Sequence, residues 1–541
     1  MKRRRIVLRP AAALVVAFAL LAGCGGNDDS GGGGGGGDAE TSGEFEYTEG
    51  MVGAQDDGGE PKAGGQLSYA MYSEPRSLDP AVSIAAVTTG GTEMAAIFDV
   101  LLRYDTETQE FVPQLAESVE ANGDNTEWTL TLRDGVTFSD GTPLDAAAVV
   151  ASQERYAAAP APEAALWNAN VTKVEATDDK TVVYTLNKPW TMFPAMLASG
   201  PGMIVAEAAG AVGDGFKPVG AGPFILVHQR AGEEVLLEAN EDYWNGRANL
   251  DELRFVYLNE QTTIQDSFAN GSVDMAFFRD PDVVDEVLEE GHSGYSNLVA
   301  VSDTTLINGT EGRPGADIRV RKAIQMAIAP DMVRQRVYDG HGMASTLIFP
   351  EYSRWHSDGM TGIDPDPEGA KKLLEEAKAD GYDGTITYLD SNTSAARDTG
   401  QVVKAALEAV GFSVELEMVP TVTDLINKLA VERDYDLAGW GINYREGDPF
   451  SKLYASLHST GKQTYGMPTS PEMDAALEEF QGAADEDAQR AAIVKVQEAW
   501  NESVPYLAWM PMAELSAWSD EVHGVKGAAN SMTLFDEAWI G

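Results

Sequence analysis

The feature that most constrains the fold is an alternation of strand and helix patterns in the last third of the chain. Residues 385–389 and 414–418 have the apolar spacing of strands, and residues 435–440 predict a third strand. Between the first two, residues 397–410 predict a helix that ends at Gly411. A β-α-β-α-β order requires parallel strands and right-handed crossovers. Because ligands bind beyond the carboxyl ends of parallel strands, the segment after the third strand is a candidate site.

A second informative block covers residues 115–152. Alternating apolar residues over 128–132 predict a half-buried strand. The turn signal Asp134-Gly135 and a short apolar run at 136–138 predict that this strand forms a hairpin. Asp145 is placed to cap a helix that begins with three alanines.

The sequence of this block resembles the signature segment of the extracellular solute-binding proteins of family 5. Those proteins supply oligopeptides, dipeptides, nickel complexes and some sugars to ABC transporters. The family pattern is LRDGVxFxDGxPLxAxDV, and Ala147 and Ala148 replace its usual acidic pair. Further segments resemble family motifs in the same order, namely SLDP at 77–80, PVGAGPF at 218–224, NEDYWNG at 240–246 and IRVRKAIQMAIAPDM at 318–332. The resemblance extends from Gly65 to the C-terminus.

This resemblance implies an α/β fold of the periplasmic-binding-protein type, with two α/β lobes, a hinge and a third, inserted subdomain. Lobe one is expected to combine residues 65–96, 211–308 and 506–541. The inserted subdomain is expected at 97–210 and lobe two at 309–505, with hinge crossings near 308 and 505. The implied mechanism is capture of a solute by lobe closure, since a ligand favours the state with which it makes more contacts.

The resemblance also implies a site. In peptide-binding members the loop after the third strand reads W-x-x-D-Y/N and then D/E-P, and its first Asp holds the α-amino group of the ligand. Here the loop is WGINYREGDP at 440–449, and Asn443 replaces that Asp. An amide can accept a hydrogen bond from an ammonium group but brings no countercharge. The expected ligand-binding residues are Trp440, Asn443, Tyr444 and Asp448 from lobe two, with Tyr72 and Ser77 from lobe one.

Several alternatives stay open at this point. Trp440 and Tyr444 could stack on a solute or belong to the core. A peptide or peptide-like compound is the expected solute, because that class dominates the family, and an oligosaccharide or a metal chelate is the alternative. A secreted hydrolase, or a surface adhesin or receptor without a transporter, are less favoured readings of the same sequence.

The N-terminus has the layout of a secretory lipoprotein. Basic residues precede an apolar run at 11–21, which is too short to span a bilayer. The sequence Leu-Ala-Gly-Cys ending at Cys24 resembles a bacterial lipobox, which predicts a signal peptide at 1–23 and a lipid anchor on Cys24. Cys24 is the only cysteine, so no internal disulfide can form. The Gly-rich, polar residues 24–64 predict a flexible tether.

Charge and motif content exclude other classes of function. A formal net charge of -48 argues against nucleic acid and anionic lipid as partners. There is no GxSxG motif, and the six histidines have no metal-ligand spacing. Acidic residues at 364–375 imitate a calcium loop, but Asp366 followed by Pro367 fits a helix start better. These absences predict a protein that is not an enzyme and binds no cofactor or metal. The resemblance to family 5 implies a monomer that delivers its solute to an ABC permease, and the N-terminal pattern predicts that it lies outside the cytoplasm on a lipid anchor.

Overall fold

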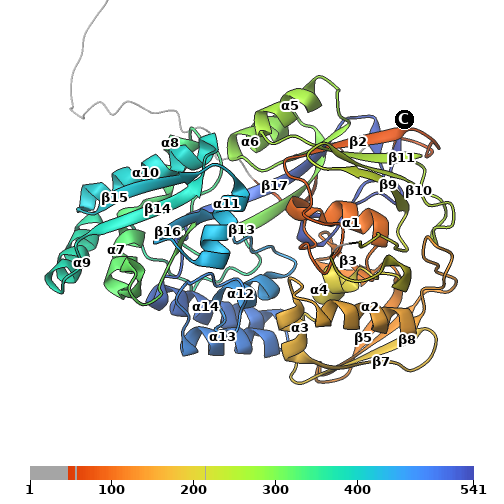
Figure 1. Ribbon diagram of the computed structural model, residues 1–541, viewed down its shortest axis with the longest axis horizontal. Coiled ribbons are helices and arrows are strands. Elements are labelled where there is room, and N and C mark those ends of the chain that lie inside the picture. The colour runs from red at the N-terminus through yellow and green to blue at the C-terminus, as the bar shows by residue number, and fades with distance from the viewer. Residues whose placement is uncertain (1–46, 55–57, 214) are drawn as a thin grey trace, which may run out of the picture. The chain divides into compact units, whose positions relative to one another are not determined.

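The computed structural model describes residues 47–54, 58–213 and 215–541, and Figure 1 labels its elements. The predictions of the signal peptide, of lipid on Cys24 and of most of the tether fall on residues outside these ranges. Among the described residues, no helix combines the length and the apolar character that a membrane crossing requires.

The β-α-β-α-β unit forms as predicted. Strand β14 (Thr385–Ser391) pairs in parallel with β15 (Ser413–Val419) and with β16 (Leu437–Trp440). Helix α10 (Ser394–Val410) is the first crossover. It ends at Gly411, whose φ of 108° is a left-handed conformation that glycine adopts without a steric penalty. The carboxyl ends of β14 and β16 therefore lie at the same edge of the sheet.

These strands belong to a larger sheet with the order β15-β14-β16-β13-β17-β12-β2-β11-β10-β9, and β1 pairs with β13 beside this path. The other strands of this sheet are β1 (Gly50–Val52), β2 (Gln66–Met71), β9 (Phe224–Arg230), β10 (Glu234–Ala239), β11 (Glu252–Tyr257), β12 (Met275–Phe278), β13 (Ser293–Ile307) and β17 (Met510–Trp518). Strand β2 pairs in parallel with both β11 and β12. The sheet thus contains two groups of parallel strands, one at each side of β13.

Strand β13 joins these two groups. Its residues 293–299 pair with β17, its residues 304–307 pair with β16, and the register shifts between Val299 and Asp303. We call the strands from β9 to β12 with β2 and β17 the first half of the sheet, and β14 to β16 the second half. Figure 1 shows β13 running from one half to the other. The change of partner lies a few residues before 308, and the exact lobe boundaries and hinges remain predictions.

A separate antiparallel sheet has the order β5-β6-β8-β7, with β5 at Ala116–Ala121, β6 at Glu127–Leu132, β7 at Val171–Ala176 and β8 at Thr181–Leu186. The strand predicted at 128–132 is confirmed as β6, and its apolar residues are the buried ones. The predicted hairpin is wrong, because β5 and β8 take both edges of β6. Of the second predicted strand, only an isolated bridge from Thr137 to Pro143 forms.

Local capping signals are confirmed. The Asp145 carboxylate accepts a hydrogen bond of 2.8 Å from the amide of Ala148 at the start of α2 (Ala146–Ala158). The Asp366 carboxylate likewise accepts from the amide of Gly369 at 3.0 Å, and Pro367 opens the helix. The remaining helices of eight residues or more are α1 (Gly91–Phe98), α5 (Gln261–Ala269), α6 (Pro281–Glu289), α7 (Ile318–Ala327), α8 (Pro330–Val337), α9 (Pro367–Ala379), α12 (Pro449–Leu457), α13 (Pro471–Gly482) and α14 (Glu486–Ser503).

Residues 47–54 correct the predicted extent of the tether, which was expected to reach 64 without packing. Strand β1 pairs antiparallel with β13 at Gly294 to Ser296. The amide of Leu298 donates to the Glu49 carboxylate at 2.6 Å, and the Ser293 hydroxyl donates to the carbonyl of Ala54 at 2.7 Å. Backbone pairing with a sheet needs no apolar run, so composition alone placed the start of the folded part too late.

Candidate functional site

The loop that follows β16 lies along β13. Asn443 has a φ of 67°, a left-handed conformation that asparagine tolerates better than most residues. Its amide donates to the carbonyl of Val301 at 2.6 Å, and the amide of Ala300 donates to the carbonyl of Tyr444 at 2.8 Å. These bonds fall between Val299 and Asp303, where the register of β13 against β17 shifts, just before β13 pairs with β16 at Thr304. The loop is therefore fixed at the junction of the two halves of the sheet.

A chain of three side-chain hydrogen bonds crosses this junction. The Arg279 guanidinium donates to the Tyr72 hydroxyl at 3.3 Å and to the Ser302 hydroxyl at 3.4 Å. The Ser302 hydroxyl in turn donates to the Asn443 side-chain oxygen at 3.3 Å. Tyr72 follows β2, Arg279 follows β12 and Asn443 comes shortly after β16. The network thus connects the carboxyl ends of parallel strands from both halves, the place where α/β sheets bind ligands.

Three carboxyl groups surround this network. The pKa of Asp303 is raised to about 7, chiefly by burial and then by the charge of Asp390, while the Arg279 charge opposes the shift. Burial also raises the pKa of Asp280 and of Asp390. Among the described residues, no group of three or more acidic, histidine or cysteine side chains is arranged to hold a metal ion. The junction therefore combines one guanidinium group with several carboxyl groups.

The raised pKa of Asp303 predicts a pH dependence of stability. A carboxyl group with a raised pKa in the fold is destabilising when ionised, so its effect grows as the pH rises from about 4 to about 7 and is constant above that range. In urea titrations, we expect the difference in the free energy of unfolding, Asp303→Asn minus the unsubstituted chain, to increase as the pH rises through this interval. The same substitution at the exposed Asp520 is the control, with no such gain. Parallel pH profiles for Asp303→Asn and the unsubstituted chain would contradict the assignment.

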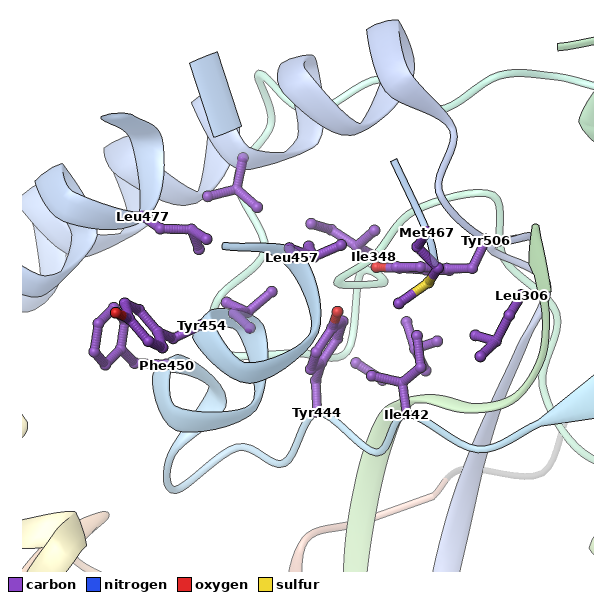
Figure 2. Close-up of a cluster of buried hydrophobic side chains, with 14 of the residues drawn as sticks. Leu306, Ile348, Ile442, Tyr444, Phe450, Tyr454, Leu457, Met467, Leu477 and Tyr506 are labelled. Carbon is purple, nitrogen blue, oxygen red and sulfur yellow. The ribbon is translucent and has the colours of Figure 1, made fainter. Parts of the chain in front are cut away.

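The two aromatic residues predicted for the site have different surroundings. Tyr444 has no exposed surface, and Figure 2 shows it among buried side chains that include Ile442, Phe450 and Tyr506. Its hydroxyl is 3.0 Å from the Ser456 hydroxyl. Trp440 is partly exposed at the end of β16, with its ring at 6.2 Å and nearly perpendicular to that of Tyr465. Of the two, Trp440 is the one with exposed surface.

Asp448 and Ser77 lie outside the hydrogen-bonded network. The Asp448 carboxylate accepts from the amide of Ser451 at 3.2 Å and caps α12. Ser77 is held within its own loop, where its hydroxyl accepts from the amide of Asp79 at 3.1 Å and its amide donates to the Ser83 hydroxyl. The structure thus brings together Tyr72, Asn443 and the adjacent Trp440, and it separates these from the other predicted residues.

The loop is anchored by a buried ion pair. The Arg445 guanidinium contacts the Glu514 carboxylate on β17 at 2.7 Å, and both side chains are nearly or fully buried. The Ser531 hydroxyl donates to the same carboxylate oxygen at 2.6 Å and accepts from Arg445 at 3.0 Å. Burial alone would raise the pKa of Glu514, but the charges of Arg445 and Arg279 lower it. The position of Asn443 therefore depends on charge pairing two residues away.

Arg279, Ser302 and Asp303 are site residues that were not predicted from the sequence. A signal for Arg279 was present, because a charged residue directly follows the apolar strand Met275–Phe278. Ser302 and Asp303 interrupt a long apolar run that became β13. Polar residues at the end of, or within, a buried strand are the pattern that could have identified them.

Comparisons with known proteins concern the chain as a whole. A family model described as bacterial extracellular solute-binding proteins, family 5 Middle, matches residues 110–464. Heme-binding protein A of Haemophilus influenzae is 24% identical over 500 residues, which are 86% of this chain and 90% of that protein. The probable D,D-dipeptide-binding periplasmic protein DdpA of Escherichia coli is 25% identical over 413 residues, 73% of this chain and 77% of that protein.

A solved structure shows the same fold. The oligopeptide-binding protein AppA from Bacillus subtilis, in complex with a nonapeptide, superposes with a TM-score of 0.76. The match covers 89% of this chain and 100% of that chain at 19% sequence identity. The periplasmic-binding-protein fold expected from the sequence is therefore confirmed.

Proposed function

The chain belongs to the bacterial extracellular solute-binding proteins of family 5, and on that premise we propose that it captures a peptide-like solute and delivers it to an ABC permease. The observation that carries the proposal is the network of Tyr72, Arg279, Ser302 and Asn443 at the junction of the two halves. A solute held there contacts both halves at once and favours their approach. This is the requirement for capture by closure.

The charges at the junction support a solute that carries both signs. The Arg279 guanidinium can pair with a carboxylate, and the carboxyl groups of Asp303 and Asp390 can take an ammonium group. A free peptide has one of each at its ends. Asn443 then contributes a hydrogen bond, while the neighbouring carboxyl groups provide the charge that Asn443 lacks. The relatives named as peptide-binding proteins support the same class of solute.

Substitutions test this site directly. We expect Trp440→Ala and Asn443→Ala each to weaken solute affinity about tenfold, because one removes an apolar surface and the other a partly buried hydrogen-bond acceptor. Isothermal titration with the solute identified below measures the change, and Thr262→Ala, at an exposed position on α5, is the control. If neither site variant changes the affinity, the solute binds elsewhere.

The identity of the solute is tested by native mass spectrometry of the exported chain, purified gently from its source cells. A series of bound masses that differ by amino-acid residues supports the proposal. A single non-peptide mass, such as a heme, a glycan or a metal chelate, overturns the peptide assignment and keeps the family. Heme-binding protein A among the relatives is the reason to keep this second outcome in view.

The remaining proposals concern location. We propose that residues 1–23 are removed on export and that Cys24 carries lipid, on the support of the basic and apolar N-terminal pattern. In this arrangement the protein acts outside the cytoplasm as a monomer on a lipid anchor, and hydrolysis of ATP elsewhere drives transport. A Cys24→Ser variant that stayed in the membrane fraction would contradict the lipid anchor.

A further inference from the structure

Residues 47–54, which we name the strap, contact parts of the chain that are far apart in sequence. The Tyr47 hydroxyl donates to the Asp285 carboxylate on α6 at 2.5 Å and accepts from the amide of Gly342 at 3.1 Å. Helix α6 packs on β17 in the first half, whereas Gly342 lies in the loop after α8, which packs on α10 in the second half. His341 reaches the same carboxylate at 2.9 Å. The amide of Gly342 also donates directly to this carboxylate at 3.3 Å, so Tyr47 reinforces a contact that groups from both halves already make.

The second contact of the strap is made by Glu49. This side chain lines a small cavity of about 10 Å³ together with Tyr104, Asn297, Arg445 and Asp448. Burial raises the pKa of Glu49 to about 8, so the carboxyl group is mostly neutral at pH 7. One oxygen accepts from the amide of Leu298 on β13. Glu49 thus lies where β13 meets the loop that carries Asn443.

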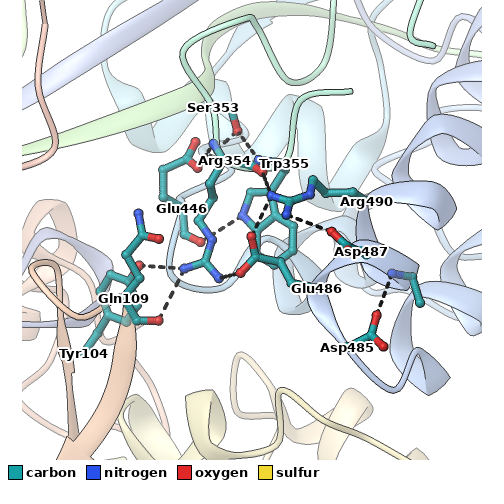
Figure 3. Close-up of polar contacts among 11 residues, drawn as sticks. Tyr104, Gln109, Ser353, Arg354, Trp355, Glu446, Asp485, Glu486, Asp487 and Arg490 are labelled. Atoms are coloured by element: carbon teal, nitrogen blue, oxygen red, sulfur yellow. Dashed lines mark hydrogen bonds and ion pairs between the residues drawn. The ribbon is translucent and has the colours of Figure 1, made fainter. Parts of the chain in front are cut away.

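Tyr104 links this cavity to a third part of the chain. Figure 3 shows Arg354 donating to the Tyr104 hydroxyl, at 3.2 Å, and to the carbonyl of Gln109, at 3.3 Å. The other guanidinium nitrogen of Arg354 contacts Glu486 on α14 at 2.8 Å. Tyr104 belongs to the hairpin of β3 (Leu102–Asp105) and β4 (Glu110–Pro113), which Arg354 connects to α14. Through the shared cavity the same tyrosine lies beside Glu49 of the strap.

We propose that the strap is a clamp that stabilises the approach of the two halves and so favours solute retention without touching the solute. The bonds of Tyr47 can all be kept only while α6 and the loop at Gly342 hold their present separation. Opening of the halves breaks at least one of them. This inference rests on the proposed function in one respect, since closure is what gives the clamp a role.

The test is hydrogen exchange of the full chain, read by mass spectrometry at the amides of Ala300 and Asn443. These amides connect β13 to the loop after β16, because Ala300 donates to the carbonyl of Tyr444 and Asn443 donates to the carbonyl of Val301. In the double variant Tyr47→Phe with Glu49→Ala, we expect both amides to exchange about tenfold faster, because hydrogen bonds that favour the approach of the halves are lost. The control is Thr48→Ala, an exposed position in the same segment, with unchanged exchange.

The outcome that overturns the clamp is faster exchange confined to residues 47–54 and their direct partners, with Ala300 and Asn443 unchanged. In that case the strap is docked on the fold and has no influence on the halves. The experiment needs no solute. A failure of the clamp is therefore distinguishable from a failure of the peptide assignment, which native mass spectrometry decides independently.

Discussion

Substitution of Arg445 by methionine is expected to lower the free energy of unfolding by about 3–5 kcal/mol, the range for breaking a buried ion pair. Arg445 contacts Glu514 at 2.7 Å, and the side chain of Glu514 has no exposed surface. Without Arg445 this carboxyl group is left in the interior with the Ser531 hydroxyl as its remaining hydrogen-bond donor. Urea denaturation at pH 7 measures the change.

Two further variants separate charge from packing. Replacing both partners, as Arg445→Leu with Glu514→Leu, should recover much of the lost stability, because no unpaired buried charge remains. Lys173→Met removes the exposed ion pair to Glu175 and should cost less than about 1 kcal/mol. If Arg445→Met costs no more than Lys173→Met, the buried pair does not anchor the loop.

The second large effect is expected at Tyr444. Tyr444→Ala should destabilise the chain by about 3–5 kcal/mol, since it empties a buried aromatic position. The ring centroid of Tyr444 lies 5.9 Å from that of Phe349 and 6.4 Å from that of Tyr506, so the lost contacts are aromatic. Tyr444→Phe keeps the ring, loses the contact to Ser456 and should cost about 1 kcal/mol.

Solute affinity then decides the role of this tyrosine. Tyr444→Phe should leave affinity unchanged, because its hydroxyl points to Ser456 in the core and not to the junction. Trp440→Ala is the informative comparison, with a smaller loss of stability and a larger loss of affinity. A large loss of affinity in a stably folded Tyr444→Phe variant would show that the Tyr444 hydroxyl belongs to the binding site.

Features set by local chemistry could be predicted from the sequence. The caps at Asp145 and Asp366 depend on residues within three positions, and Gly411 ends its helix through its own φ. The strand β6 follows from alternation that a short window contains. In each case the residues that determine the structure are neighbours in the chain.

Features set by distant partners could not be predicted in the same way. The turn at Asp134-Gly135 suggests a hairpin, but β6 pairs instead with β8, which lies about fifty residues further along the chain. Residues 47–54 look like a tether until β13 is placed beside them. The loop after β16 was found, but which of its side chains face the core depends on the left-handed turn at Asn443. Arg279 was missed because its contact with Ser302 exists only once β17 has brought β12 and β13 into one sheet.

Strand β17 has a consequence for how the protein is made. It lies between β12 and β13 in space, yet it follows the whole second half of the sheet in sequence. A polypeptide emerging from the ribosome therefore exposes two unpaired strand edges until Met510–Trp518 arrives. Because such non-local pairings form slowly, this sheet can be completed only after the last part of the chain has been made. A copy truncated before β17 keeps both edges open and is prone to aggregate.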